Sequence, residues 1–158
     1  MVAGHVLRVP LQAYRVRGLA ESLVRPVLRI QVQSRDRSFK DVEMRVDCAT
    51  AMTTISAARA IDLGLPIPRK VVTLTVETAA GLITQRRHPG RITVRIPRLA
   101  MREFNWPCHF VHEGEPAPGP LLGLAGVLDD LRITLDGSYS LEAPYGWLVL
   151  EEMIRSQS

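Results

Sequence analysis

The sequence contains few aromatic residues, few cysteines and no long apolar run. Phe, Trp and Tyr make up 5% of its 158 residues, so Val, Leu and Ile must supply most of the core. Cys48 and Cys108 are too few for a disulfide framework. No apolar run exceeds about eight residues, whereas a membrane-spanning helix needs roughly 20. Since no signal-peptide pattern is visible either, we expect a cytoplasmic protein with no membrane partner.

The composition is that of an ordinary globular domain. Apolar residues make up 46% and charged residues 23% of the chain, which excludes disorder, collagen and coiled coil as descriptions of the whole chain. A length of 158 residues suits one domain. The net charge of +4 is carried mainly by arginine, because Lys40 and Lys70 are the only lysines. This mild positive charge suits an acidic partner without requiring one.

Alternation of apolar and polar residues with a period of two dominates the chain and predicts β-structure. The segments 26–33 and 39–46 both alternate, and the polar run between them predicts a β-hairpin. Further strands are predicted over 71–76, 82–86, 91–96, 104–111, 131–135 and 138–143. The last two are joined at Asp136-Gly137, a strong hairpin turn signal. With short helices predicted only over 56–63 and 124–131, the expected fold class is all-β.

The predicted core runs over residues 26–143 without an internal boundary. We expect residues 1–25 to form an N-terminal arm or an extra strand. The tail over 144–158 is expected to supply a dimer-interface strand or a short helix. Residues 113–120 are rich in Pro and Gly, and we interpret them as a loop because these residues interrupt regular structure.

One acidic residue stands in a distinctive setting. The segment 46–56, VDCATAMTTIS, places Asp47 at the end of the predicted hairpin, before small residues and a Thr/Ile/Ser run. Residues 119–137, GPLLGLAGVLDDLRITLDG, hold two leucines and a glycine ahead of a predicted helix. Together with RAIDLGLP at 59–66, this pattern resembles the aspartic peptidases of the retroviral type, the retropepsins, over residues 26–143.

The resemblance implies a retropepsin-like closed β-barrel or sandwich with a flap hairpin. It implies that Asp47 is the catalytic residue. Support of the active-site loop then belongs to Cys48, Ala49, Thr50, Leu121, Leu122 and Gly123. The segment VETAAGLIT at 76–84 is similar to the flap of bacterial members. Flap and substrate-binding roles are implied for Thr78, Ala79, Ala80, Gly81 and Leu82.

The chemistry of such a site needs two carboxyl groups. Held a few ångström apart, they retain one proton between them, so one can take a proton from water while the other supplies one. This chain has one aspartate in a suitable motif, and the resemblance implies a homodimer in which each copy contributes Asp47 at a two-fold axis. The implied substrate is an extended polypeptide, and neither a metal nor another cofactor is implied.

Three residues depart from the family pattern. Cys48 stands where the family has Thr, Ala49 where it has Gly, and Thr50 where it has Ala. The thiol of Cys48 is a weaker hydrogen-bond donor than a threonine hydroxyl. The methyl group of Ala49 would displace the carboxyl groups, and reaction rates are sensitive to displacements of about 1 Å. An alternative therefore stays open: a catalytically weakened dimeric module that binds peptides or partners. Cys48 as a nucleophile would need an adjacent His, so we interpret it as a buried thiol.

Two further patterns favour simpler interpretations. Six arginines fall between 86 and 102 with no acid among them, which is typical of a basic nucleic-acid-binding β domain. Nucleic acid is nevertheless the partner that the sequence favours least, because the segment alternates and lacks aromatic residues for base stacking. Cys108, His109 and His112 lie on a predicted strand, where residues four apart are roughly 13 Å from each other. That separation argues against a zinc site and favours a core role for Cys108.

Overall fold

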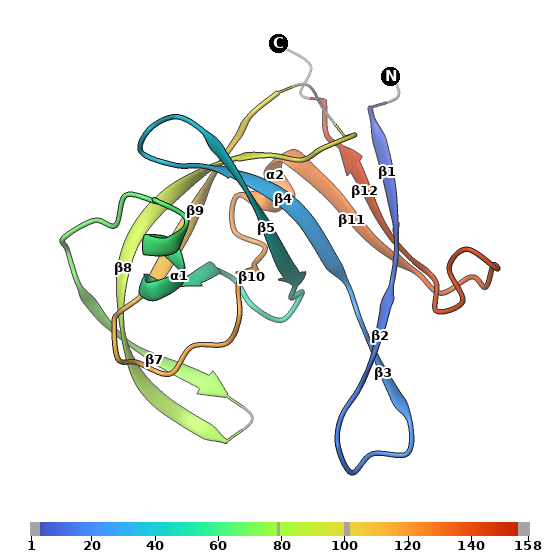
Figure 1. Ribbon diagram of the computed structural model, residues 1–158, viewed down its shortest axis with the longest axis horizontal. Helices are drawn as coiled ribbons and strands as arrows, with labels where there is room; N and C mark the ends of the chain where they lie inside the picture. The colour runs from blue at the N-terminus through green and yellow to red at the C-terminus, as the bar shows by residue number, and fades with distance from the viewer. Residues whose placement is uncertain (1–3, 79, 100–101, 155–158) are drawn as a thin grey trace.

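The computed structural model describes residues 4–78, 80–99 and 102–154 (Figure 1). Within these ranges the chain forms three β-sheets and two short helices, so the predicted all-β class is confirmed. The main sheet has seven strands in the order β4–β5–β10–β6–β9–β8–β7. Their bounds are Val27–Gln33 for β4, Phe39–Val46 for β5, Leu121–Leu122 for β10, Thr53–Ser56 for β6, Phe104–Val111 for β9, Gly81–Arg95 for β8 and Val72–Thr78 for β7.

The main sheet closes on itself. Besides its pairing with β5, β4 pairs with β8, with Gln31 opposite Arg95 and Val32 opposite Val94. Six strands therefore form a barrel, and β7 extends from it as the partner of β8. The β4–β8 contact spans two residue pairs, and β10 also pairs with β5 at two positions, so the rest of β4 and of β5 has a neighbouring strand on one side only. The closed barrel expected from the sequence is confirmed by this pairing.

The barrel interior is filled by the apolar residues of the alternating strands. On β5, for example, Val42, Met44 and Val46 are buried while Glu43 and Arg45 are exposed. Burial of apolar surface is the main favourable contribution to folding, and this alternation delivers it from each strand. The largest fully buried side chains include Trp106, Phe104 and Phe110 of β9, with Leu28, Ile30, Met44, Ile55, Leu122, Leu131 and Leu148 around them.

The first helix follows directly from its sequence. Helix α1, Ala57–Asp62, begins after Ser56, whose side chain accepts a 3.1 Å hydrogen bond from the backbone N–H of Arg59. Gly64, at a φ of 68°, carries the chain out of the helix. Helix α2, Val127–Asp130, is shorter than the predicted 124–131. Neither of these described helices has the length and apolar character that a membrane crossing requires.

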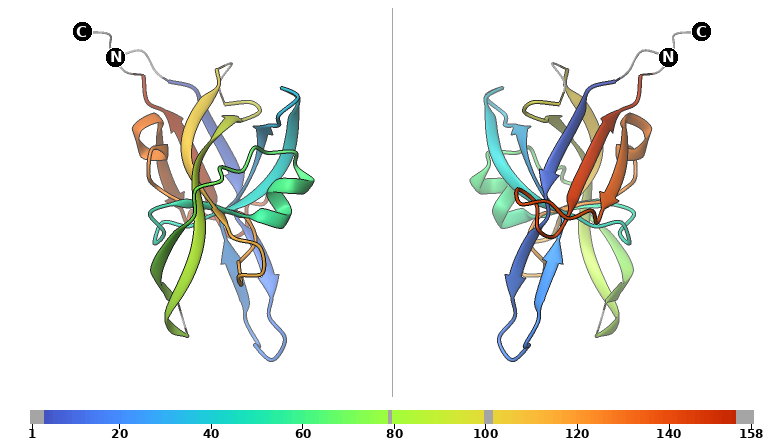
Figure 2. Two further views of the ribbon diagram at one scale, coloured as in Figure 1. Left: turned by 90° about the vertical axis from the view of Figure 1, so that its left-hand side faces the viewer. Right: turned by 90° about the vertical axis from the view of Figure 1, so that its right-hand side faces the viewer.

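The N-terminal residues form strands of their own. Strand β1, Val6–Pro10, pairs antiparallel with β12, Trp147–Glu152, which also pairs with β11, Leu131–Asp136. Strands β2, Gln12–Arg15, and β3, Ser22–Arg25, form a separate hairpin. This hairpin and the β7–β8 hairpin project from the barrel on the same side (Figures 1 and 2).

One strand is longer than predicted. The segments 82–86 and 91–96 were expected as separate strands, but β8 runs unbroken through Pro89. The backbone N–H of His112 donates to the carbonyl of Arg86, so the even-numbered residues of β8 point their backbone groups toward β9. Pro89 points its nitrogen to the other side, beyond the end of the β7 pairing, where no donor is needed.

The predicted hairpin partner of β11 is wrong. Residues 138–143 form no strand, and β11 pairs along its whole length with β12 instead. In the segment between them Ala143 is buried, but Tyr139 and Leu141, which alternate with it, are 73% and 91% exposed, so the alternation does not mark a buried strand face. The backbone N–H of Ser140 donates to the carbonyl of Ala143, and Gly146, at a φ of 97°, turns the chain into β12.

Candidate active site

Asp47 directly follows β5, and its backbone is still bonded to β10 and its flanking residues. The N–H of Arg45 donates to the carbonyl of Pro120 at 3.1 Å, and the N–H of Asp47 donates to the carbonyl of Leu122 at 3.0 Å. The chain therefore remains extended through Asp47. Because side chains two residues apart on an extended chain share a face, the half-buried Asp47 lies on the same face as Arg45.

The short strand β10 is inserted between two strands that follow each other in the chain. It runs parallel to β5 and antiparallel to β6. The loop over 47–52 connects β5 to β6, and the residues after β10 bond to this loop. The N–H of Leu124 donates to Thr50 O at 3.1 Å, and the N–H of Ala125 donates to Ala51 O at 2.7 Å. Both ends of the Asp47 loop are thus held by one distant segment.

Gly123 is the point of closest approach between these two segments. A Cβ atom at this position would lie 2.7 Å from both the carbonyl oxygen of Met52 and the backbone nitrogen of Thr53. The N–H of Gly123 donates a 3.1 Å hydrogen bond to Oγ1 of Thr53, which is fully buried. The position therefore requires glycine for space, and its φ is not in the left-handed region.

The carboxylate of Asp47 is oriented by its own loop. Oδ1 accepts a 3.0 Å hydrogen bond from the N–H of Ala49, and Oδ2 accepts a 2.8 Å bond from the hydroxyl of Thr50. Each carboxylate oxygen can accept two hydrogen bonds, so capacity remains for a water or a shared proton. Among the residues that the structure describes, no hydrogen-bond partner of Asp47 is itself an acid.

The tip of the Asp47 loop is exposed in the single chain. Cys48 and Ala49 both lie at the surface, so the prediction of a buried Cys48 thiol is wrong. Of the other loop residues Ala51 is also exposed, whereas Asp47, Thr50 and Met52 are half-buried. Cys108 behaves as predicted: it is fully buried in β9, and burial raises the pKa of its thiol to about 12.

The segment predicted to form the flap is the tip of the β7–β8 hairpin. Thr78 lies opposite Gly81, which has a φ of 111°, and Leu82 beside it is 73% exposed. Ala79 lies outside the described residues, and Ala80 is in the turn. The hairpin extends past the barrel on the side toward which β5 runs (Figure 1). Within the described chain, no hydrogen bond links Asp47 to this hairpin.

The structure thus brings together only part of the predicted site. Asp47 contacts Ala49, Thr50 and Leu122, and Leu122 leads into Gly123. Leu121 is buried and pairs with both β5 and β6. The residues at the tip of the β7–β8 hairpin stay apart from this group in the single chain.

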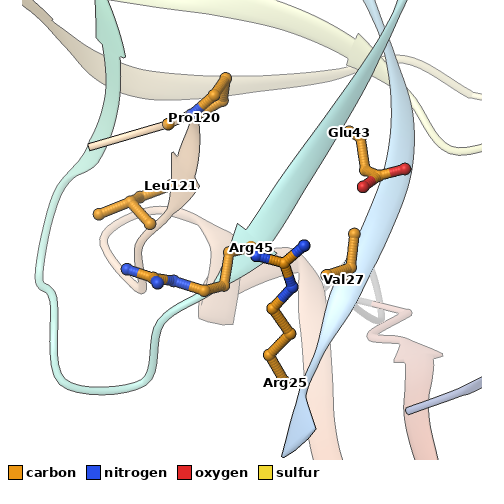
Figure 3. A pocket seen from close by; sticks show the side chains of 7 residues that line it. Arg25, Val27, Glu43, Arg45, Pro120 and Leu121 are labelled. Carbon is orange, nitrogen blue, oxygen red and sulfur yellow. The ribbon is translucent and has the colours of Figure 1, made fainter. Parts of the chain in front are cut away.

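A cavity of about 200 Å³ lies against the last part of β5, where Arg45 precedes Asp47 by two residues, and the sequence analysis did not predict it. It is lined by Arg25, Val27, Glu43, Arg45, Gly119, Pro120 and Leu121. Figure 3 shows the Arg25 guanidinium between Arg45 and Val27, and the Arg45 side chain directed toward the Leu121 side. The one available sequence signal was the alternation that places Glu43, Arg45 and Asp47 on a common face. The contribution of Arg25 depends on where the β2–β3 hairpin packs, which no local pattern reveals.

Three of the six arginines between 86 and 102 form ion pairs in the described chain. Arg86 contacts Glu115 at 2.8 Å, Arg95 contacts Glu103 at 2.7 Å, and Arg102 contacts Glu152 at 2.5 Å. The three arginine side chains are about half exposed, and the pairs offset half of the positive charge of this stretch. The arrangement agrees with the solvent-face interpretation of this stretch.

The histidines near this stretch form a small polar network. Nε2 of His88 lies 2.8 Å from Nδ1 of His112, and Nδ1 of His88 lies 2.7 Å from the carbonyl oxygen of Pro68. His109 is not part of this chain of contacts. No group of three or more His, Cys, Asp or Glu side chains in the described ranges is arranged to hold a metal ion.

Comparison with known proteins shows a similarity in structure and none in sequence. No protein-family model matches the chain, and no curated protein matches its sequence. Among solved structures, the chain is similar to a retropepsin-like aspartic protease from Rickettsia conorii. The two are 17% identical, the match covers 80% of this chain and 93% of that chain, and the TM-score is 0.46.

Proposed function

We propose that this chain is an aspartic endopeptidase that acts as a homodimer, with Asp47 of each copy at the shared site. The observation that supports the proposal most directly is the double attachment of the Asp47 loop. Leu122 holds Asp47 itself, and Leu124 and Ala125 hold the other end of the loop. Such bonding fixes the orientation of a carboxylate on rigid strands, which a catalytic group needs.

The dimer follows from the chemistry. One ionised aspartate can act as a base, but hydrolysis of a peptide bond also needs an acid for the departing nitrogen. Asp47 has no acidic neighbour among its partners in the described chain, so the second carboxyl group must come from another copy. The exposed tip residues Cys48 and Ala49 leave the loop free to meet its equivalent at a two-fold axis.

The reaction then needs no covalent intermediate. The ionised Asp47 takes a proton from water, and the water oxygen forms a bond to the carbonyl carbon of the substrate. The protonated Asp47 of the other copy donates its proton to the carbonyl oxygen. As the tetrahedral intermediate collapses and the C–N bond breaks, the Asp47 that took the proton from water gives it to the departing nitrogen. The other Asp47, now ionised, takes a proton from a hydroxyl group of the intermediate as the carbonyl re-forms, which restores the starting state. The β7–β8 hairpin would cover an extended substrate and exclude water.

The test is hydrolysis of a diverse peptide library by the purified chain over about pH 4 to 7. We expect cleavage by the unaltered chain and none by Asp47→Asn, which keeps the shape but cannot act as base or acid. Asp41→Asn on the exposed face of β5 is the matched control and should cleave normally. Equal cleavage by the Asp47→Asn variant, or a strictly monomeric active species in sedimentation, would refute the proposal.

A second candidate is a dimeric module that binds peptides without cutting them. It is favoured by the engagement of both Asp47 oxygens by Ala49 and Thr50 within their own loop. The double substitution Cys48→Thr with Ala49→Gly separates the two candidates. A large gain in cleavage indicates a weakened peptidase site, whereas binding with no gain in cleavage indicates a binding module.

A further inference from the structure

The cavity is lined by Glu43 and Arg45, which are on the exposed face of β5 that leads to Asp47. Arg45 precedes Asp47 by two residues on the same face, a spacing of about 7 Å along an extended chain. Across the sheet, Arg45 lies between Val27 on β4 and Leu121 on β10. A polypeptide held at Asp47 would therefore place a side chain next to its reacting bond over this cavity.

The cavity has the size of one side chain. Its volume of about 200 Å³ lies below the range typical of sites for drug-sized ligands. Val27 and Leu121 supply a buried apolar wall, and Pro120 adds to it. These surfaces suit the methylene groups of a side chain, while the polar groups at the rim decide which end group is accepted.

The charges at the rim are unbalanced toward the positive. Arg25 and Arg45 both line the cavity, and Glu43 is the one acid that lines it with them. In the described part of the chain, neither arginine has a carboxylate oxygen within 4 Å, whereas six ion pairs between other arginines and carboxylates are present. The Nε of Arg25 is buried without a hydrogen-bond partner, and its guanidinium stacks on Tyr14 at 4.8 Å.

We propose that this cavity is a specificity pocket for an acidic side chain, with Arg45 and Arg25 as the residues that select it. A substrate carboxylate there would accept charge-assisted hydrogen bonds from the guanidinium groups. No carboxylate of the described chain forms an ion pair with either arginine. It would also offset the positive charge of two arginines that line the same cavity. The inference rests on the proposed function, because it assumes that a polypeptide lies across the Asp47 face.

The test measures peptide binding separately from cleavage. The Asp47→Asn protein is immobilised and offered libraries of extended octapeptides in which one position at a time is fixed as Glu, Gln or Lys. Retained peptides are identified by mass spectrometry, and individual pairs are then compared by fluorescence anisotropy. At one position we expect Glu to bind about tenfold more tightly than Gln, the low end for a charge-assisted hydrogen bond in an open pocket.

Three variants in the same background show where the preference originates. Arg45→Gln should reduce the Glu preference to near unity, and Arg45→Glu should favour Lys at that position. Arg35→Gln removes the same charge from an exposed side chain in the β4–β5 turn and should leave the preference intact. A variant with a damaged fold would lose binding and would not gain a preference for Lys. Binding of Lys peptides by Arg45→Glu therefore shows that the charge at position 45 sets the preference.

The outcomes separate the pocket from the peptidase. Equal binding of Glu and Gln peptides at every position, or loss of the preference in Arg35→Gln, overturns the acidic pocket even if the unaltered chain cleaves peptides. A Glu preference that depends on Arg45, with no cleavage by the unaltered chain, supports the pocket and overturns the peptidase. Where cleavage occurs, kcat/KM should fall about tenfold when Glu at that position becomes Gln.

Discussion

The N–H of Gly123 donates a 3.1 Å hydrogen bond to Oγ1 of Thr53, and this bond joins the segment after β10 to the first residue of β6. It lies in the interior, since Thr53 is fully buried. The bond and the close backbone approach around it fix the far end of the loop that carries Asp47. The geometry of Asp47 therefore depends on two residues that do no chemistry themselves.

Thr53→Val should destabilise the protein. The substitution keeps the shape of the side chain but leaves the buried N–H of Gly123 without its acceptor, which costs about 1–3 kcal/mol. Urea unfolding measures the change. Thr73→Val on the exposed side of β7 is the control and should alter the free energy of unfolding little. Equal stability of the two variants would show that the Gly123 N–H finds another partner.

Gly123→Ala should harm both stability and activity. The added methyl would lie 2.7 Å from the carbonyl oxygen of Met52, so the β10 segment or the Asp47 loop must move. Overpacking of this kind typically costs about 1–3 kcal/mol, and displacement of the loop should abolish cleavage that depends on Asp47. Gly137→Ala is the matched control, because nothing lies within 4 Å of its added methyl. A Gly123→Ala variant with full stability would contradict the close packing described here.

The strands were predictable where a single local pattern controls them. The hairpin of β4 and β5 alternates strictly, and β9 occupies the predicted 104–111. The prediction failed where a partner strand decides the outcome. Pro89 and Gly90 read locally as a break, yet β8 continues because its pairing on the β9 side needs no donor from Pro89. Strand β10, with two residues, exists only because β5 and β6 lie on either side of it.

Some residues of the candidate site could likewise be predicted from the sequence, and others could not. Asp47, Leu122 and Gly123 could be singled out from the sequence because turn, apolar and glycine signals mark them together. The presence of Arg25 and Arg45 at one cavity could not, because it depends on where the β2–β3 hairpin, whose residues are exposed or half-buried, places Arg25 relative to β5. Exposure of Cys48 was missed because a loop tip looks the same in sequence whether or not another segment covers it.

The two cysteines should react very differently with a thiol reagent. Cys48 is exposed in the single chain, so it should be modified in the native protein at concentrations where the chain is monomeric. Cys108 is fully buried, and burial raises the pKa of its thiol to about 12, so it should react only after unfolding. One fast and one denaturation-dependent thiol in a quantitative labelling assay is the expected result. Rapid labelling of both would contradict the burial of Cys108.

The same residue tests the arrangement of the proposed dimer. If two Asp47 loops meet at an axis, the two Cys48 residues lie close together, and mild oxidation should yield a disulfide-linked dimer. Cys48→Ser should abolish the linked species, while Cys108→Ala should retain it. Linked dimers in the Cys48→Ser variant, or none in the unaltered chain at concentrations where it sediments as a dimer, would place the interface elsewhere.

Acid should weaken the fold through His109. Its Nδ1 is buried without a hydrogen-bond partner among the described residues, and burial together with the charge of Arg87 lowers its pKa below the usual 6.5. The unfolded chain then binds more protons than the folded chain below that pH, so stability is complete above about pH 6.5 and declines as pH falls toward the lower folded-state pKa. The free energy of unfolding should therefore decrease more steeply between about pH 7 and 5 in the unaltered chain than in His109→Gln.

The control for this effect is His5→Gln, which removes an exposed imidazole and should keep the slope of the unaltered chain. Urea unfolding at each pH gives the comparison, and an identical slope for His109→Gln would show that His109 does not contribute. The pH dependence of stability runs opposite to the pH dependence expected for cleavage. An aspartate pair that shares a proton operates in acid, whereas His109 favours neutral pH. Cleavage by His109→Gln should therefore persist to lower pH than cleavage by the unaltered chain, because the same active site would then be carried by a fold that does not lose stability as His109 is protonated.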